Sequence, residues 1–217
     1  MDTELAGKID HTLLTPEATE EQVGKLCSEA KQYSFASVCI NPTHIKLAKK
    51  LLTGSSVKVC TVIGFPLGAN VSAVKAYEAK TAVEDGADEV DMVINIGALK
   101  DGNDSLVLND IRSVVEAVRK DTVVKVIFEN CLLTDDEIMK ACALSEKAGA
   151  DFVKTSTGFN QWGAKVEDVA LMKKCVGNRL KVKAAGGIHD YKTAIALVRA
   201  GADRIGASRS IDIISGK

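Results

Sequence analysis

The 217-residue chain has few aromatic residues and almost no net charge. Aromatic residues make up 4% of it, and 28 basic side chains are balanced by 29 acidic ones. Without an excess of positive charge, binding to nucleic acid has no electrostatic basis. No apolar run approaches the roughly 20 residues that span a bilayer. The N-terminal segment MDTELAGKID lacks the apolar region of an export signal. We therefore expect a cytoplasmic protein with no nucleic-acid or membrane partner.

Cysteine and histidine pairs at metal-binding spacing are also missing. The six cysteines include no CxxC pair and have no histidine at zinc spacing: Cys27, Cys39, Cys60, Cys131, Cys142 and Cys175. We expect free thiols in a reducing compartment and no metal site. Of the three histidines, we expect His11 in IDHTLL to be structural, and His44 and His189 to lie on the surface.

Only three prolines occur, and no linker or low-complexity stretch divides the chain. We therefore predict a single domain over residues 1–217. A weak repeat runs through it, because a helix-like stretch three times ends in Gly-Ala-Asp before an apolar strand, at Gly86, Gly149 and Gly201. A left-handed turn after a helix costs glycine little. The following residues are apolar on both faces, which is typical of parallel strands covered by helices.

The same pattern predicts eight strands, near Lys8–His11, Ala36–Ile40, Val57–Ile63, Glu89–Asn95, Val123–Glu129, Asp151–Thr155, Leu180–Ala184 and Arg204–Gly206. Helix-like stretches lie between them, at Glu20–Tyr33, Ser72–Glu84, Leu106–Arg119, Asp135–Lys147, Val166–Cys175 and Tyr191–Ala200. Eight strand–helix units in one domain predict the α/β class and a (β/α)8 TIM barrel. A doubly wound open sheet is the alternative, but the glycine fingerprint that follows its first strand is missing.

Charged side chains interrupt three of these apolar strands, at Asp91, Lys154 and Lys183. We expect the two lysines to end their strands, where barrel enzymes place their chemistry. An ordinary interior ion pair is the alternative for each one alone. Two lysines on neighbouring strands, about 4.8 Å apart, repel each other, and this repulsion favours a neutral amine that attacks carbonyl groups. Asp91 would then transfer protons. The residues alone leave open which lysine is the nucleophile.

Lysines at positions 58, 125 and 181 also fall within predicted strands. Lys58 and Lys181 lie early in theirs, toward the end of the barrel that carries no chemistry, and we interpret both as structural. Lys125 precedes Glu129 by four residues, which suggests an interior ion pair beside the site.

Glycines at the ends of the last strands indicate an anion site. Gly186 and Gly187 follow the seventh predicted strand, and Gly206 and Ser208 belong to a loop after the eighth, ahead of a short helix from about Arg209. Barrels commonly hold a phosphate on the backbone of these two loops. Gly158 in STGF would add another close backbone approach. Simple turns are the alternative.

Eight strings carry a resemblance over nearly the whole chain: IDHTLL, ASVCINP, VIGFPLG, GADEVDMVINIG, KVIFEN, GADFVKTSTGF, VKAAGGI and RIGAS. In this order and spacing, the sequence resembles the short bacterial type of the deoxyribose-phosphate aldolase family. The resemblance implies a class I, metal-free TIM-barrel aldolase that needs no cofactor and serves deoxyribose phosphate catabolism. It would cleave 2-deoxy-D-ribose 5-phosphate reversibly into D-glyceraldehyde 3-phosphate and acetaldehyde. Dimers are common in that family, so a homodimer is expected.

The resemblance also implies residue roles. Lys154 would form the Schiff base, Lys183 would keep Lys154 neutral and assist proton transfer, and Asp91 would donate and accept protons. The phosphate-binding positions would be Gly158, Gly186, Gly187, Gly206 and Ser208. Three residues depart from the family pattern: Arg209 replaces a second serine, Asn130 follows Glu129 in place of threonine, and Phe159 stands where some relatives have lysine.

Two alternatives remain open from the sequence. Another Schiff-base barrel aldolase acting on a keto acid would need an arginine for the carboxylate, and we expect only Arg204 and Arg209 near the mouth of the barrel. A sugar-phosphate binding protein without activity would have lost at least one of Asp91, Lys154 and Lys183, and all three are present.

Overall fold

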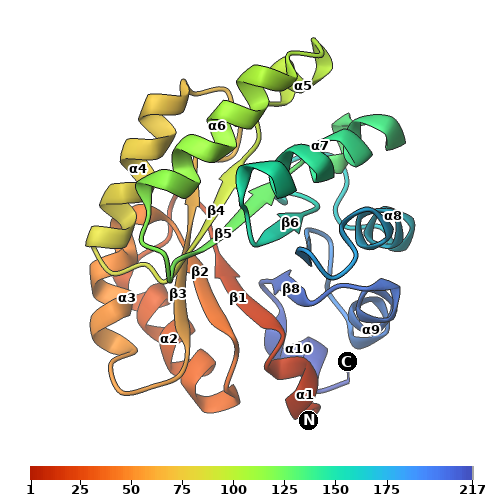
Figure 1. Cartoon of the computed structure of the whole chain (residues 1–217). Coiled ribbons are helices and arrows are strands. Elements are labelled where there is room, and N and C mark those ends of the chain that lie inside the picture. The colour runs from red at the N-terminus through yellow and green to blue at the C-terminus, as the bar shows by residue number, and fades with distance from the viewer. Residues whose placement is uncertain (217) are drawn as a thin grey trace.

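Eight parallel strands close into a barrel in chain order, and β8 pairs with β1 (Figure 1). The structure is a computed structural model that describes residues 1–216. The strands are β1 (Ile9–Leu13), β2 (Ser37–Ile40), β3 (Lys58–Ile63), β4 (Glu89–Val93), β5 (Val123–Ile127), β6 (Phe152–Lys154), β7 (Lys181–Ala185) and β8 (Arg204–Ala207). The (β/α)8 prediction is confirmed, and the open sheet is excluded.

Helices surround the barrel and connect successive strands. The six predicted helices are present, as α2 (Glu20–Tyr33), α4 (Ser72–Glu84), α6 (Asp104–Ala117), α7 (Asp135–Ala148), α8 (Val166–Val176) and α9 (Tyr191–Ala200). A short C-terminal helix was also expected. The sequence analysis missed the shorter elements α1 (Thr3–Ala6), α3 (Ile45–Leu51) and α5 (Ile96–Lys100), and the 3-10 turns η1 (Pro42–His44) and η2 (Asn130–Leu132). These helices span at most two turns, too few residues for a clear periodic pattern.

Helix ends are fixed by local chemistry, as α7 illustrates. The Thr134 side chain accepts a hydrogen bond from the backbone N–H of Glu137, whose carboxylate in turn accepts one from the Thr134 N–H. Gly149 ends the helix with φ at 89°, in the left-handed region that glycine adopts without steric cost. Gly86 and Gly201 also have positive φ, which confirms the interpretation of the Gly-Ala-Asp repeat.

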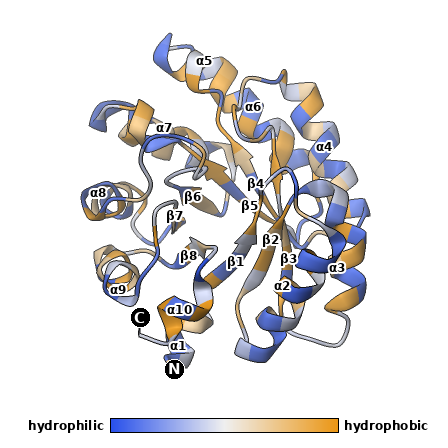
Figure 2. Cartoon of the chain, turned by 180° about the vertical axis from the view of Figure 1, so that it is seen from behind, coloured by the Kyte–Doolittle hydropathy of each residue, from blue (hydrophilic) through white to orange (hydrophobic). Residues whose placement is uncertain are grey.

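The barrel strands are buried on both faces, and every residue of β2, β4 and β6 is buried. The helices carry hydrophobic and hydrophilic residues on different sides (Figure 2). Burial of the strands removes their charged residues from water, so each charge needs a partner of opposite sign.

Strand register brings the charged residues together. Lys154 and Lys183 are directly paired positions on β6 and β7, and Asp91 and Lys125 are directly paired on β4 and β5. Two expectations were wrong in detail. Lys183 lies in the middle of β7, two residues before its end, and Gly206 lies within β8 instead of after it. The closed barrel extends both strands, because their backbone groups are hydrogen-bonded to neighbours on each side.

The first and last described segments of the chain lie side by side in the ring of helices around the barrel. The backbone N–H of Asp2 donates to the carbonyl of Ile214 over 3.1 Å, and α1 packs against α10 (Ser210–Ile214). Figure 1 shows the N- and C-terminal segments side by side. Among residues 1–216, no helix combines the length and apolar character needed to cross a membrane.

Candidate active site

Asp91 is the centre of a buried charge cluster inside the barrel. Its Oδ2 accepts hydrogen bonds from the ammonium groups of Lys154 at 2.8 Å and Lys183 at 2.7 Å. Its Oδ1 accepts one from Lys125 at 2.7 Å. Burial opposes the charged form, but the three ammonium groups outweigh it and hold the pKa of Asp91 well below its usual range. The carboxylate is therefore ionised.

Lys183 is held on both sides by carboxylates. Besides Asp91, it contacts Asp10 Oδ2 at 2.5 Å, and it is fully buried. Burial disfavours its charge, but Asp10 and Asp91 raise its pKa above the usual value. Gly206 leaves the space that this side chain needs, since a Cβ there would lie 3.1 Å from Lys183 Cε. Lys183 is therefore a fixed cation of the cluster.

Lys125 belongs to the same cluster, which corrects its expected pairing with Glu129. Its Nζ lies 2.5 Å from Glu89 Oε2 and 2.7 Å from Asp91 Oδ1. A side chain four residues along a strand lies on the same face but about 13 Å away, so Lys125 pairs across strands instead. The sequence analysis missed the roles of Glu89 and Asp10 because neither stands out from the ordinary charged residues of a strand.

Arg204 completes the cluster at its lower end and corrects a second expectation. It begins β8, far from the strand ends that form the mouth, and contacts Asp10 at 2.5 Å and Glu89 at 3.2 Å. It is therefore not available to bind a carboxylate at the mouth. Lys58 and Lys181 begin their strands and are exposed, as expected for structural residues.

Lys154 differs from the other cations of the cluster because it borders a cavity. It ends β6 and lines a hollow of about 400 Å³, whereas Lys125, Lys183 and Arg204 do not. In this cluster, four cations face the three carboxylates of Asp10, Glu89 and Asp91. The geometry thus favours Lys154 as the amine of the cluster that meets a ligand.

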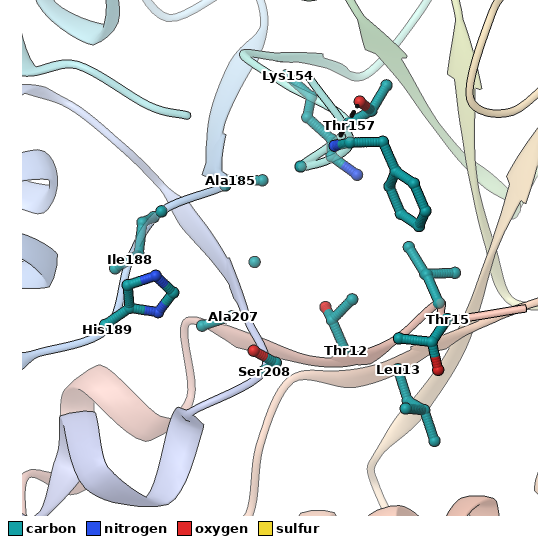
Figure 3. Close-up of a pocket in the computed structure, with 16 residues that line it drawn as sticks. Thr12, Leu13, Thr15, Lys154, Thr157, Ala185, Ile188, His189, Ala207 and Ser208 are labelled. Atoms are coloured by element: carbon teal, nitrogen blue, oxygen red, sulfur yellow. Dashed lines mark hydrogen bonds between the residues drawn. The ribbon is translucent and has the colours of Figure 1, made fainter. Parts of the chain in front are cut away.

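The cavity opens at the C-terminal ends of the strands. Lys154 and Thr157 lie on one side of it, Thr12 and Ser208 lie opposite, and His189 lies on a third side (Figure 3). All five expected phosphate-binding positions line it: Gly158, Gly186, Gly187, Gly206 and Ser208. The cavity is therefore lined by every predicted site residue except Asp91 and Lys183. These two lie behind its wall, where Asp91 is hydrogen-bonded to both Lys154 and Lys183.

Gly163 supports this loop cluster and was missed by the sequence analysis. A Cβ on Gly163 would lie 1.9 Å from the carbonyl oxygen of Gly186, so the two backbones touch. The N–H of Ala164 donates to the same carbonyl over 3.0 Å. Its sequence context, QWGAK, contains no pattern that reveals this long-range contact.

Glu129 and Asn130 hold the loop that follows Lys154. Glu129 accepts hydrogen bonds from the backbone N–H and the hydroxyl of Thr157, whose side of the loop lines the cavity. The Asn130 amide donates to Asp168 at 3.3 Å and to the sulfur of Met172 at 3.4 Å. The Asn130 departure from the family pattern is thus accommodated by contacts to α8, away from the cavity.

The remaining departures and histidines lie around the mouth. Phe159 lines the cavity and packs edge-on against Phe65, with ring centroids 5.2 Å apart. Arg209 is exposed and lines a neighbouring hollow that shares Ser208 with the cavity. His11 is buried and bonds to Ser210 and Glu29, as expected for a structural residue.

His44 is half-buried, and its Nε2 lies 3.2 Å from the Ala18 carbonyl oxygen. His189 is exposed as expected, but it also lines the cavity, which its sequence position did not reveal.

Comparison with known proteins agrees with this geometry. A barrel whose strand ends surround a cavity, with a buried lysine–carboxylate cluster below it, is the architecture of a barrel enzyme. The chain belongs to the DeoC/LacD family of aldolases, which matches residues 5–216.

Within that family, the chain is similar to deoxyribose-phosphate aldolases. It is 59% identical to the one from Geobacillus sp. (strain WCH70) over 217 residues, covering 100% of this chain and 97% of the relative. It is 63% identical to the one from Streptococcus suis (strain 98HAH33), covering 96% and 94%. The tetrameric deoxyribose phosphate aldolase from Aeropyrum pernix superimposes with a TM-score of 0.91 at 37% identity, covering 98% of this chain and 90% of that one.

Proposed function

We propose that the chain cleaves 2-deoxy-D-ribose 5-phosphate reversibly into D-glyceraldehyde 3-phosphate and acetaldehyde, through a Schiff base on Lys154. The observation that carries this proposal is the position of Lys154, the cation of the buried cluster that borders the cavity while it is bonded to Asp91. The full-length similarity to deoxyribose-phosphate aldolases supports the choice of substrate. The reaction places the protein in deoxyribose phosphate catabolism.

In the first step, the neutral Lys154 amine attacks the aldehyde carbon C1 of the open-chain sugar. The carbinolamine hydroxyl then takes up a proton from the water in the cavity and leaves as water, and a protonated imine remains. The imine nitrogen carries a positive charge next to Asp91, so the contact between Lys154 and Asp91 persists through this step. The water-poor surroundings of the cluster strengthen that attraction.

The second step breaks the bond between C2 and C3. Asp91 accepts the proton of the C3 hydroxyl, the C3 oxygen forms a carbonyl, and glyceraldehyde 3-phosphate leaves. The electron pair of the broken bond moves toward the imine nitrogen and forms an enamine. Asp91 then returns the proton to C2, and hydrolysis releases acetaldehyde and Lys154. Lys183, bonded to the same Asp91 oxygen, stabilises the Asp91 carboxylate before the first transfer and after the second.

The phosphate of the substrate would lie on the glycine-rich loops. Gly158, Gly186 and Gly187 have φ values of 85°, 85° and 71°, which favour glycine. Because these residues carry no side chain, their backbone is accessible at this wall of the cavity. Backbone N–H groups together with the Ser208 hydroxyl can bind phosphate oxygens. The binding roles of these residues and of Gly206 are proposed from their position and from the family pattern.

We propose that the reaction needs neither a metal ion nor an organic cofactor. Cys39, Cys60 and Asp91 have ligand-type atoms within 4.8 Å of one another. The Asp91 oxygens already accept hydrogen bonds from three ammonium groups, which would repel a metal cation. The charge needed to stabilise Asp91 and the imine therefore comes from lysines.

Borohydride trapping tests the mechanism. The protein is incubated with deoxyribose 5-phosphate and EDTA, treated with borohydride, and digested for peptide mass spectrometry. We expect a reduced adduct on Lys154, together with turnover that EDTA does not change. An adduct on Lys183 would reassign the nucleophile, and a folded protein without any lysine adduct would refute the Schiff-base mechanism.

A homodimer and a cytoplasmic location complete the proposal. Four exposed apolar side chains in and before α4 support self-association: Leu67, Val71, Val74 and Tyr77. Light scattering on the protein as it elutes from a size-exclusion column measures the mass of the assembly. The double variant Val74→Lys and Tyr77→Lys should be monomeric if this surface forms the dimer contact. The free thiols support a cytoplasmic location.

A further inference from the structure

Two cysteines lie side by side within the barrel. Cys39 on β2 and Cys60 on β3 are directly paired positions, so their side chains point to the same side, and both are fully buried. Neighbouring strands are about 4.8 Å apart, within the range of about 4.4–6.8 Å between Cα atoms that a disulfide bridges. The two sulfurs and an oxygen of Asp91 lie within 4.8 Å of one another.

This thiol pair is in contact with the charge cluster. The Cys60 thiol donates to Asp91 Oδ1 over 3.2 Å, and Lys125 donates to the Cys60 sulfur over 3.3 Å. The pair packs with Leu14, which lines the cavity. A change in the Cys60 sulfur would therefore reach Asp91 directly, and Leu14 connects the thiol pair to the wall of the cavity.

The two thiols differ in acidity. Hydrogen bonding with Cys60 lowers the pKa of Cys39 against the opposing effect of burial, and Lys183 and Lys154 add to the lowering. Burial, the bond with Cys39 and the Asp91 charge raise the pKa of Cys60 well above its usual value. Because the thiolate is the reactive form, Cys39 is the better nucleophile of the pair.

We propose that Cys39 and Cys60 form an oxidation site, in which a peroxide converts the thiol pair to a disulfide that disables the catalytic cluster. The loss of turnover rests on the proposed function, whereas disulfide formation does not.

The Cys39 thiolate attacks one peroxide oxygen, the O–O bond breaks, and the departing oxygen takes up a proton to leave as water or alcohol. The Cys60 sulfur then attacks the Cys39 sulfenic acid. The S–S bond forms, the S–O bond breaks, and water leaves with the Cys60 proton. The peroxide gains the two electrons that the thiols lose.

Disulfide formation removes the thiol hydrogen that Cys60 donates to Asp91 and draws its sulfur toward Cys39. Asp91 loses one of its four hydrogen-bond donors. Displacements of about 1 Å in a catalytic group can reduce the rate about a hundredfold. We therefore expect the oxidised protein to lose at least about tenfold in turnover.

Peptide mapping of the full chain after hydrogen peroxide treatment tests the proposal. We expect a disulfide-linked pair of peptides that contain Cys39 and Cys60, a matching loss of turnover, and recovery of both after dithiothreitol. Cys39→Ser and Cys39→Ala should form no such link and should retain turnover after the same treatment. Two variants are used because serine in an apolar site can destabilise the fold.

Cys142 and Cys175 form a second pair of neighbouring thiols, on α7 and α8, and provide a matched control. Cys175→Ser should lose turnover on oxidation to the same extent as the unmodified chain. The proposal is overturned if peroxide oxidises the partly exposed Cys175 while Cys39 and Cys60 stay reduced, or if their disulfide forms without loss of turnover. A reduced protein that lacks turnover would instead refute the proposed function, and the peptide map would still report on the disulfide.

Discussion

At the scale of single residues, the structure shows different surroundings for two lysines that the sequence alone does not distinguish. Lys154 and Lys183 are directly paired on adjacent strands and bonded to the same oxygen of Asp91. Lys183 has a second carboxylate partner and full burial, whereas Lys154 ends its strand at the cavity. The difference between the two lysines therefore depends partly on Asp10, which lies 173 positions away from Lys183 in the chain and outside any local pattern around either lysine.

Replacing Lys154 tests its role most directly. Lys154→Ala should reduce turnover by more than about a thousandfold, because no other amine of the cluster borders the cavity in the described residues 1–216. Circular dichroism and thermal unfolding should show an intact fold, since the variant also removes a surplus positive charge from the cluster. Turnover close to that of the unmodified chain would rule out Lys154 as the nucleophile.

Replacing Lys183 should change the pH dependence. Lys183 lowers the pKa values of both Asp10 and Asp91 against the opposing effect of burial. Lys183→Ala removes that effect, both values rise, and Asp91 becomes protonated at higher pH. The acidic limb of the pH–rate profile should therefore move to higher pH and the rate near neutrality should fall. An unchanged profile would contradict a role for Lys183 in stabilising the Asp91 carboxylate.

At the scale of secondary structure, the sequence predicted the strands and long helices well, because the strands are continuous apolar runs and the longer helices alternate buried and exposed faces. Lys154 falls at the end of β6 as expected. The supports of the cavity were not predictable in the same way. Glu129 acts on Thr157, and Gly163 acts on Gly186, through contacts between separate loops. Only the closed barrel brings these loops together, so the spacing of residues along the sequence does not predict the contacts.

Two glycine substitutions test whether the contact between Gly163 and Gly186 supports the cavity. Gly163→Ala places a Cβ against the Gly186 carbonyl, which should displace the proposed phosphate loop and raise KM by about tenfold to a hundredfold. Gly24→Ala in α2 meets nothing within 4 Å and should raise the free energy of unfolding by about 0.5–1 kcal/mol, with KM unchanged. Kinetics and urea unfolding of both variants measure these outcomes. Equal KM values for the two would show that the Gly163 contact does not position the substrate.

At the scale of the whole molecule, the charge cluster links stability to pH. The pKa values of Asp10 and Asp91 are lowered in the fold, so their contribution is present above the unfolded value near 4 and is lost as the pH falls. The pKa of Lys183 is raised, so its contribution is present below the unfolded value near 10.4 and is lost as the pH rises further.

Urea unfolding across the pH range should therefore give a plateau in the free energy of unfolding, with losses at both acidic and strongly basic pH. Asp10→Asn should flatten the acidic decline, because one of the titrating carboxylates is gone. A decline of the same steepness in that variant would place the acid sensitivity in other groups.

The pairing of β8 with β1 closes the barrel in space, and the hydrogen bond between Asp2 and Ile214 holds the first and last segments of the open chain side by side. The position of the chain ends can then change without a change in the architecture. A gene rearranged so that a short linker joins residue 217 to residue 1, with new ends in the loop between α6 and β5, would encode the same eight units in a different order. Such a circular permutant should assemble the same lysine–carboxylate cluster, because every residue of that cluster lies on a strand and none lies at either junction.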